Sequence, residues 1–304
     1  MEPAGSADPL VAALRGRLGE LGLPSGSSWS VESGYHNVRA TDSASVFCKI
    51  MGEGSKTSRL GRELRFASSF AGAAFTPLVP GLVEFELNGE LRFASVWEFL
   101  PGVQPLGVEG LTLGNCGEVA SRLAGLHGMP LAGLDSVFTL VELREIVERR
   151  LAGFRGLVDE RSLRVFSLLA DEFLYSDFAF DVSHVIHGDA HLSNVVESAV
   201  GVRWSDFEGV CLGPREWDVA TLSLFAGRLG GRQSELEVML QVFEAEEPLD
   251  VGLLNRFEVV KALTFVSAVA QDPRNVPTFV SWMGQLAPLL DGAAFPHSLE
   301  KIVY

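Results

Sequence analysis

Residues 184–194 of the chain read HVIHGDAHLSN, and residues 204–210 read WSDFEGV. Each stretch begins with apolar residues typical of a short strand and continues into polar residues typical of a loop. Asp189 and Asp206 therefore lie on loops that follow rigid elements, a common position for functional side chains. Asn194 follows Asp189 by five residues, and Asp206 follows Asn194 by twelve.

Oxygen-bearing side chains in this pattern suit phosphoryl transfer. Mg²⁺ prefers oxygen and usually takes one or two protein side chains together with the phosphates of its substrate. Asn194 and Asp206 are the candidate ligands. Asp189 would then orient an attacking hydroxyl group and accept its proton.

A zinc site is the main alternative reading of the first stretch. His187, Asp189 and His191 alternate along the chain, and on an extended strand they would share one face. A zinc site needs a further ligand, and the other histidines are scattered: His36, His127, His184 and His297. A hydrogen-bonded turn without chemistry is the third interpretation.

Strand-like and helical patterns divide the sequence near residue 100. The first part predicts two helices and two hairpins, the second of which turns at Asn88 and Gly89. In order, these elements are a helix over 8–22, a strand over 29–33, a hairpin over 38–50, a helix over 57–71 and a hairpin over 82–100. The second part predicts helices over 112–128, 138–155, 160–176, 215–229, 232–245, 251–271 and 276–290. We therefore expect two lobes, 1–100 and 101–304, joined near residues 98–103, with a ligand site between them.

Composition excludes several classes of protein. The chain has 304 residues and a formal net charge of −15, which argues against a nucleic-acid partner. An acidic protein is compatible with a cationic ligand, although solubility alone is the simpler explanation. Glycine and proline interrupt the apolar runs, so we expect no membrane span. Three widely spaced cysteines and the lack of a secretory signal favour a cytoplasmic protein, which we expect to be a monomer or weak dimer.

Taken together, HGDAHLSN (187–194) and SDFEGVCLGPREWDVA (205–220) resemble the signature of the aminoglycoside phosphotransferase and choline kinase superfamily. The interval from Asp189 to Asn194 equals that of the kinase catalytic loop, and Asp206 stands where kinases carry a metal-binding Asp. The resemblance implies an α+β, bilobal protein-kinase-like fold with a small antiparallel-sheet lobe and a larger, mainly helical lobe. It also implies ATP, or another nucleoside triphosphate, and Mg²⁺ as cofactors.

The first lobe supplies the expected nucleotide-binding parts in order. Lys49 lies in the strand-like SVFCKI (45–50), and Glu63 on the following helix is its expected partner, because a buried ammonium group needs one. In kinases such a lysine contacts the α- and β-phosphates. WEFLPG (97–102) resembles the hinge, so the backbone of Glu98 and Leu100 would contact adenine.

The phosphate-binding loop departs from the kinase pattern, since no GxGxxG motif precedes the lysine. Its candidate is ESGYHNV (32–38), which has a single glycine. Backbone amides near Gly34, His36 and Asn37 would cradle phosphate there.

The resemblance also implies roles for residues around the two motifs. Asp189 is the general base, whereas Asp218, His187 and His191 support the loop that carries it. Glu208 is a candidate for the acceptor site or for a second Mg²⁺.

The predicted function is phosphorylation of a hydroxyl group on a small cationic molecule, such as an aminoglycoside or a basic peptide antibiotic, in resistance or self-protection. The alternatives are a metabolic kinase for choline, homoserine or a sugar, and a nucleotide-binding pseudokinase. A protein kinase is disfavoured because no APE-type activation segment follows DFEG.

Overall fold

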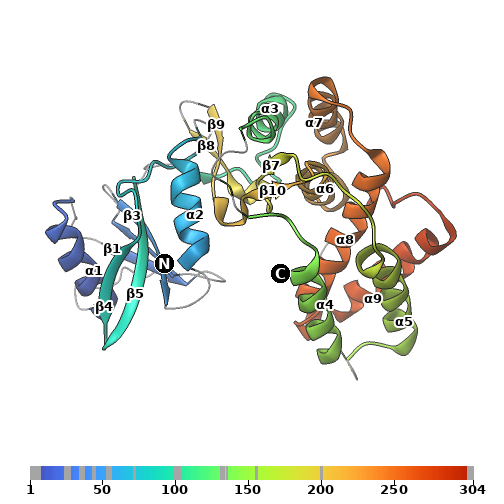
Figure 1. Cartoon of the computed structure of the whole chain (residues 1–304). Helices are drawn as coiled ribbons and strands as arrows, with labels where there is room; N and C mark the ends of the chain where they lie inside the picture. Colours follow the sequence, from blue (N-terminus) through green and yellow to red (C-terminus); the bar gives the residue numbers. More distant parts are fainter. Residues whose placement is uncertain are drawn as a thin grey trace. The chain divides into compact units, whose positions relative to one another are not determined.

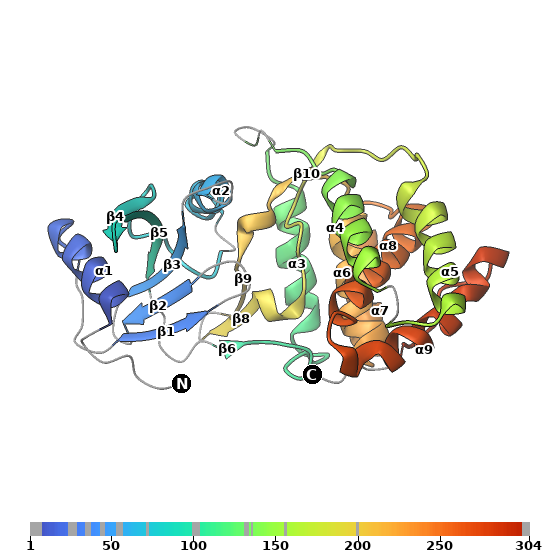
Figure 2. The same ribbon diagram turned by 90° about the horizontal axis from the view of Figure 1, so that it is seen from below.

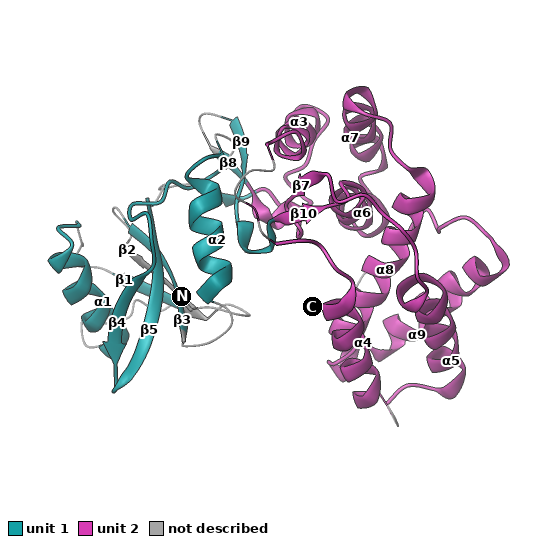
Figure 3. Cartoon of the chain, viewed as in Figure 1, with its two compact units in different colours: residues 1–105, 196–210 teal, residues 106–195, 211–304 magenta. Residues whose placement is uncertain are grey.

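The chain divides into two compact units in the computed structural model (Figure 3). The first unit contains residues 1–105 and 196–210, and the second contains residues 106–195 and 211–304. The structure describes residues 8–23, 29–33, 38–42, 46–52, 57–70, 73–98, 104–130, 134, 136–154, 157–198 and 201–299. The division at residue 105 falls close to the expected boundary near residue 100. The expected second lobe, however, included 196–210, which the structure groups with the first unit.

A five-stranded antiparallel sheet forms the centre of the first unit (Figure 1). Its order is β1 (Trp29–Ser33), β2 (Val38–Asp42), β3 (Val46–Gly52), β5 (Glu90–Glu98) and β4 (Val83–Leu87). Asn88 and Gly89 turn the chain from β4 into β5 with φ values of 55° and 79°. Positive φ at both positions is what the tight hairpin turn predicted from Asn-Gly requires.

Helix α1 (Pro9–Glu20) covers one face of this sheet. It begins at Asp8, whose carboxylate accepts a hydrogen bond from the backbone of Leu10 at 2.8 Å. Its buried residues pack in a core with alternate residues of β3, namely Val46, Cys48 and Ile50. Because side chains alternate along a strand, Lys49 points to the opposite face. Helix α2 (Thr57–Ala67) lies on that face and buries Glu63.

Residues 196–210 complete the first unit. Strand β8 (Val195–Ser198) pairs with β6 (Gln104–Pro105) and β9 (Gly201–Trp204), and the carbonyl of Trp204 accepts a hydrogen bond from Ala74 N–H at 2.7 Å. A 3₁₀ turn, Phe207–Gly209, follows β9. The ring of Phe207 is buried against Phe66 and Phe70, at 5.1 and 5.7 Å between centroids. These contacts fix the position of Asp206, the residue before the turn.

The second unit is mainly helical (Figure 2). Its helices are α3 (Cys116–His127), α4 (Val141–Gly153), α5 (Glu160–Leu169), α6 (Glu216–Leu222), α7 (Gln233–Glu246), α8 (Val251–Val269) and α9 (Val276–Leu286). Helix α3 runs beside α7, and α6 packs against α8. The predicted helices 160–176 and 215–229 are present, but each ends in a π-helical segment, Ala170–Tyr175 and Ser223–Leu229.

A short antiparallel pair in the second unit precedes the loop that carries Asp189. Strand β7 (His184–Ile186) pairs with β10 (Cys211–Gly213), so the chain before Asp189 is held to the chain before α6. The predicted strand-to-loop transition at this point is therefore present. Among the described helices, none is long and apolar enough to cross a membrane.

Candidate active site

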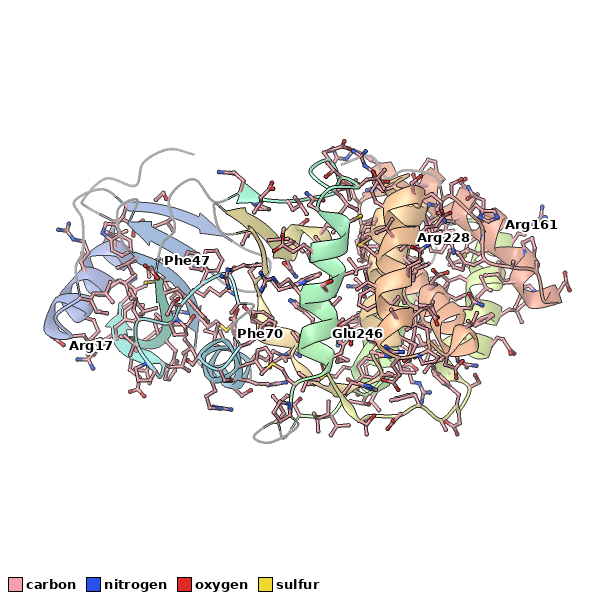
Figure 4. The ribbon with its side chains drawn as sticks, turned by 90° about the horizontal axis from the view of Figure 1, so that it is seen from above. Arg17, Phe47, Phe70, Arg161, Arg228 and Glu246 are labelled. Carbon is pink, nitrogen blue, oxygen red and sulfur yellow. The ribbon has the colours of Figure 1, made fainter. Side chains whose placement is uncertain are left out.

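Lys49 and Glu63 meet within the first unit, as the sequence predicted. The Lys49 ammonium nitrogen lies 2.8 and 2.9 Å from the two carboxylate oxygens of Glu63. Both side chains are almost fully buried. Phe47, labelled in Figure 4, lies two residues before Lys49 on the same face of β3 and packs against Phe75 at 5.9 Å between ring centroids. The buried ammonium group is thus paired with a carboxylate that is buried too.

Two further carboxylates contact the same ammonium group. Asp206 Oδ1 lies 2.7 Å and Glu208 Oε1 lies 3.3 Å from Lys49 Nζ. Oxygen atoms of Glu63, Asp206 and Glu208 all lie within 4.8 Å of one another, so they could hold a metal ion. An all-oxygen donor set is the kind that Mg²⁺ and Ca²⁺ prefer. Three carboxylates with one ammonium group leave this cluster negatively charged when all are ionised.

Asp206 adopts an uncommon backbone conformation, with φ 64° and ψ 56°. Asp and Asn tolerate this left-handed region better than other non-glycine residues. The next residue is fixed too, because Phe207 N–H donates a hydrogen bond to Glu63 Oε1 at 3.1 Å. Glu63 therefore binds both the Lys49 side chain and the backbone that presents Asp206.

Electrostatics keep the Lys49 side chain charged. Burial alone would lower the pKa of Lys49, but the charges of Glu63, Asp206 and Glu208 outweigh burial and raise it above the usual range. Burial raises the pKa of Glu63, and Asp206 adds to this shift. The direction for Lys49 follows from geometry, because one ammonium group faces three carboxylates.

Asp218, in the second unit, fixes the loop that carries Asp189. Its carboxylate is fully buried and accepts hydrogen bonds from the backbone N–H groups of His187 at 2.7 Å and Gly188 at 2.9 Å. His127 Nε2 lies 3.1 Å from the same carboxylate. Gly188 has a φ of 83°, a conformation that favours glycine. The buried Asp218 carboxylate therefore holds the backbone of this loop at His187 and Gly188.

The Asp189 side chain is 60% exposed, unlike those that support it. Its backbone carbonyl accepts a hydrogen bond from the Asn194 side-chain nitrogen at 2.9 Å, which closes the loop between the two motif residues. His191 Nε2 lies 3.4 Å from Asp189 Oδ2. Asp189 N–H donates a long hydrogen bond, 3.4 Å, to Nδ1 of the fully buried His187 ring. The structure thus brings Asp189, Asn194 and both histidines together in one loop.

The surroundings of Asp189 favour its ionised form. Partial loss of solvation by itself raises the pKa of Asp189, but the hydrogen bond and charge of His191, followed by the charge of Lys261, lower it to about 2. The exposed carboxylate is therefore an anion across the physiological range. Zinc is not favoured here, because His187 is buried and its ring nitrogen faces the loop backbone.

Two residues beside this loop were not predicted from the sequence, Trp217 and Lys261. Trp217 Nε1 donates a hydrogen bond to the Gly188 carbonyl at 2.8 Å. The Lys261 ammonium nitrogen lies 3.7 Å from the centre of the Trp217 ring, and the residue is only 9% exposed. Burial lowers the pKa of Lys261 to about 8, although Asp189 and Asp218 oppose that shift. A single lysine within the apolar run VVKALTF (259–265) was the available signal.

Four predicted nucleotide-binding residues, Gly34, His36, Asn37 and Leu100, lie outside the described residues. Glu98 is described: it ends β5, is exposed, and its backbone N–H donates to the Thr76 carbonyl at 2.9 Å. The adenine contact expected of Glu98 stays a prediction. Nearby, the buried Trp97 donates a hydrogen bond to Ser95 at 2.9 Å.

Comparison with known proteins identifies the family of the chain. Residues 30–250 match the model of the phosphotransferase enzyme family. Because this match covers well over half of the sequence, the chain belongs to that family. It is a small-molecule phosphotransferase with an alcohol group as acceptor, and the predicted superfamily is confirmed. A comparison with curated proteins found no match.

Solved structures show the same fold at low sequence identity. The amicoumacin kinase hAmiN, in complex with AMP-PNP, Ca²⁺ and Ami, has a TM-score of 0.65 at 13% identity over 88% of this chain and 89% of its own. The GDP complex of wild-type aminoglycoside 2′-phosphotransferase-IIIa has a TM-score of 0.62 at 14% identity, over 92% and 97%. Choline kinase LicA from Streptococcus pneumoniae has a TM-score of 0.57 at 15% identity, over 92% and 98%. The predicted α+β, protein-kinase-like fold class is confirmed.

Proposed function

We propose that this phosphotransferase uses ATP and Mg²⁺ to phosphorylate a hydroxyl group of a small molecule. The observation that carries the proposal is the cluster of Lys49 with Glu63, Asp206 and Glu208 in the first unit. A fixed ammonium group suits nucleotide phosphates, and the adjoining carboxylates suit the accompanying cation. Nucleotide complexes among the structural neighbours, with GDP and with AMP-PNP, support a purine nucleotide.

Within this cluster we assign the metal to Asp206, with Glu208 beside it. Both contact Lys49 through one carboxylate oxygen, and both retain partial exposure, 29% for Asp206 and 15% for Glu208. Glu63 is more deeply buried and positions Lys49 and Phe207. A bound Mg²⁺ would neutralise phosphate charge. The position of Glu208 next to Lys49 favours this role over the acceptor-site role considered from the sequence.

In the second unit we assign the general base to Asp189. Its carboxylate is exposed and ionised, whereas its backbone is fixed through Asn194 and through Asp218. A carboxylate with a pKa of about 2 is a weak base. It would therefore orient the acceptor hydroxyl by accepting its hydrogen bond and receive the proton late, as the new P–O bond forms. The role of Asn194 as a Mg²⁺ ligand stays a prediction. The hydrogen bond to the Asp189 carbonyl uses the side-chain nitrogen of Asn194, whereas a metal would bind its side-chain oxygen.

The acceptor class is proposed from charge. The formal charge of −15 supports a cationic natural product such as an aminoglycoside or a basic peptide antibiotic. A metabolic hydroxy compound is the second candidate, and Lys261 favours it, since a cation close to Asp189 repels an ammonium group there.

Two measurements test the proposal. Mg·ATP should raise the melting temperature of the protein, with Mg·GTP run in parallel because of the GDP-bound neighbours. A panel of hydroxyl acceptors is then incubated with the better nucleotide, and products are identified by the mass gain of one phosphate. Nucleotide binding without turnover on any acceptor or water would contradict phosphotransfer and support the pseudokinase alternative.

A further inference from the structure

Lys261 is a buried cation that the nucleotide and metal assignments do not use. It lies on α8 and is only 9% exposed. The chain has four lysines, at positions 49, 56, 261 and 301. Its ammonium group forms no hydrogen bond or ion pair with any residue in the described ranges. The contact with the Trp217 ring, at 3.7 Å, offsets part of the cost of burial but leaves the three N–H donors without acceptors.

The carboxylates that could pair with Lys261 are already engaged. Asp218 accepts from two backbone N–H groups and from His127. Glu258, one turn earlier on α8, binds Ser223 and Arg228, the latter labelled in Figure 4. Because the protein satisfies these groups in other ways, an acceptor for the Lys261 donors has to come from water or from a ligand.

Lys261 and Asp189 influence each other without a direct ion pair. The charge of Lys261 lowers the pKa of Asp189, and the charge of Asp189 raises that of Lys261. Trp217 joins the two groups, because its ring lies against the Lys261 ammonium group and its indole N–H donates to the carbonyl of Gly188, the residue before Asp189. The carboxylate is exposed and its partner within the loop is His191, so a ligand that reaches Asp189 also comes near the ammonium group.

We propose that Lys261 is a specificity-determining residue that binds an oxygen of the acceptor, preferably a carboxylate, beside the hydroxyl group that Asp189 orients. This rests on the proposed role of Asp189. It selects hydroxy acids, or molecules whose reacting hydroxyl is flanked by oxygen, against those with an ammonium group at that position. An acceptor that is cationic overall satisfies the same rule when its amino groups lie elsewhere.

Small probes test binding without turnover. Protein labelled with ¹³C at the lysine ε-carbons is titrated separately with glycolate, which places a carboxylate beside a hydroxyl, and with ethanolamine, which places an ammonium group there. The Lys261 signal is assigned by its loss in Lys261→Met. Glycolate is expected to shift that signal saturably and ethanolamine to leave it unchanged. No shift with glycolate, or a shift only with inorganic phosphate or Mg·ATP, would overturn the proposal.

Kinetics give the second readout, with an acceptor found in the panel. Loss of one charge-assisted hydrogen bond is expected to raise the acceptor KM of Lys261→Met by about 10- to 100-fold, and Lys261→Arg should recover part of it. The matched control is Arg161→Met, which removes an exposed cation of α5 (Figure 4). The assignment is contradicted if Lys261→Met raises only the KM for the nucleotide. It is also contradicted if Lys261→Met and the wild type have equal KM values for the acceptor. Failure of phosphotransfer itself would appear in the panel, whereas the titration reports on Lys261 alone.

Discussion

Lys49 and Glu63 form a buried ion pair in which one ammonium group faces both oxygens of one carboxylate, at 2.8 and 2.9 Å. Removing the cation leaves Glu63 buried beside two other carboxylates. Lys49→Met should therefore lower the free energy of unfolding at pH 7 by about 3 kcal/mol, measured by urea unfolding. Arg65→Met, which removes an exposed cation of α2, should change it by less than about 0.5 kcal/mol. Equal stability of the two variants would show that the ion pair is not a net stabiliser.

The left-handed backbone of Asp206 separates two effects of its substitution. Asn tolerates a φ of 64°, whereas Ala is strained there, so Asp206→Ala should be less stable than Asp206→Asn by about 1 kcal/mol. Both variants lose the carboxylate and should lose the increase in melting temperature produced by Mg·ATP. A full Mg²⁺-dependent increase in Asp206→Asn would contradict the metal assignment.

Asp218 offers a test of how the loop that carries Asp189 is supported. In Asp218→Asn an amide NH₂ replaces one acceptor oxygen and faces a backbone N–H donor of His187 or Gly188. One buried donor without an acceptor should cost about 2 kcal/mol of unfolding free energy and reduce turnover through the displaced loop.

The control for this variant is Asp250→Asn at the start of α8. Asp250 accepts from Leu253 N–H at 2.9 Å, and Asn caps helices equally well. Unfolding of both variants is followed by circular dichroism. If Asp218→Asn is as stable as Asp250→Asn, the loop does not depend on the charged acceptor.

Asp189→Asn should keep the fold and lose the reaction. The side chain is exposed, so stability should be close to that of the wild type, while turnover should fall by about 10²- to 10⁴-fold. Because the pKa of Asp189 is about 2, the wild-type rate should show no titration of this group between about pH 5 and 8. Ser193→Ala, an exposed change on the same loop, is the control. Near-normal transfer by Asp189→Asn would exclude it as the base.

Lys261 predicts a pH dependence of stability. Its pKa is about 8 in the folded protein and 10.5 in its ordinary state, so between these values the unfolded chain binds more protons. The unfolding free energy of the wild type should therefore rise relative to Lys261→Met as pH increases through this window, by on the order of 3 kcal/mol in full. Urea unfolding of both proteins at pH 7 and pH 10 measures the difference. A difference that does not change with pH would show that the folded and unfolded pKa values of Lys261 are alike.

Local patterns were enough to predict the Asn88–Gly89 turn and the helices of the second unit, whereas the pairing of Lys49 with Glu63 was expected alongside the family resemblance. Contacts between distant segments were harder. Lys261 stands in an apolar helical run, where periodicity indicates only core packing, and its closeness to Asp189 depends on how α8 packs against α6. The π-helical ends of two helices were not predicted either, because the pattern used to predict helices has the α-helical period of 3.6 residues.

The first unit is built from two separate segments of the chain, residues 1–105 and 196–210, which sets the order in which it can fold during synthesis. Asp206 and Phe207 reach Lys49, Glu63 and Phe66 from a segment that the chain supplies only after about two thirds of its length. Because a polypeptide leaves the ribosome from its N-terminus, residues 1–105 emerge with their sheet and with Glu63 but without Asp206 and Phe207. The first unit can be completed only after residue 210 has emerged, when residues 106–195 of the helical unit are already available to fold.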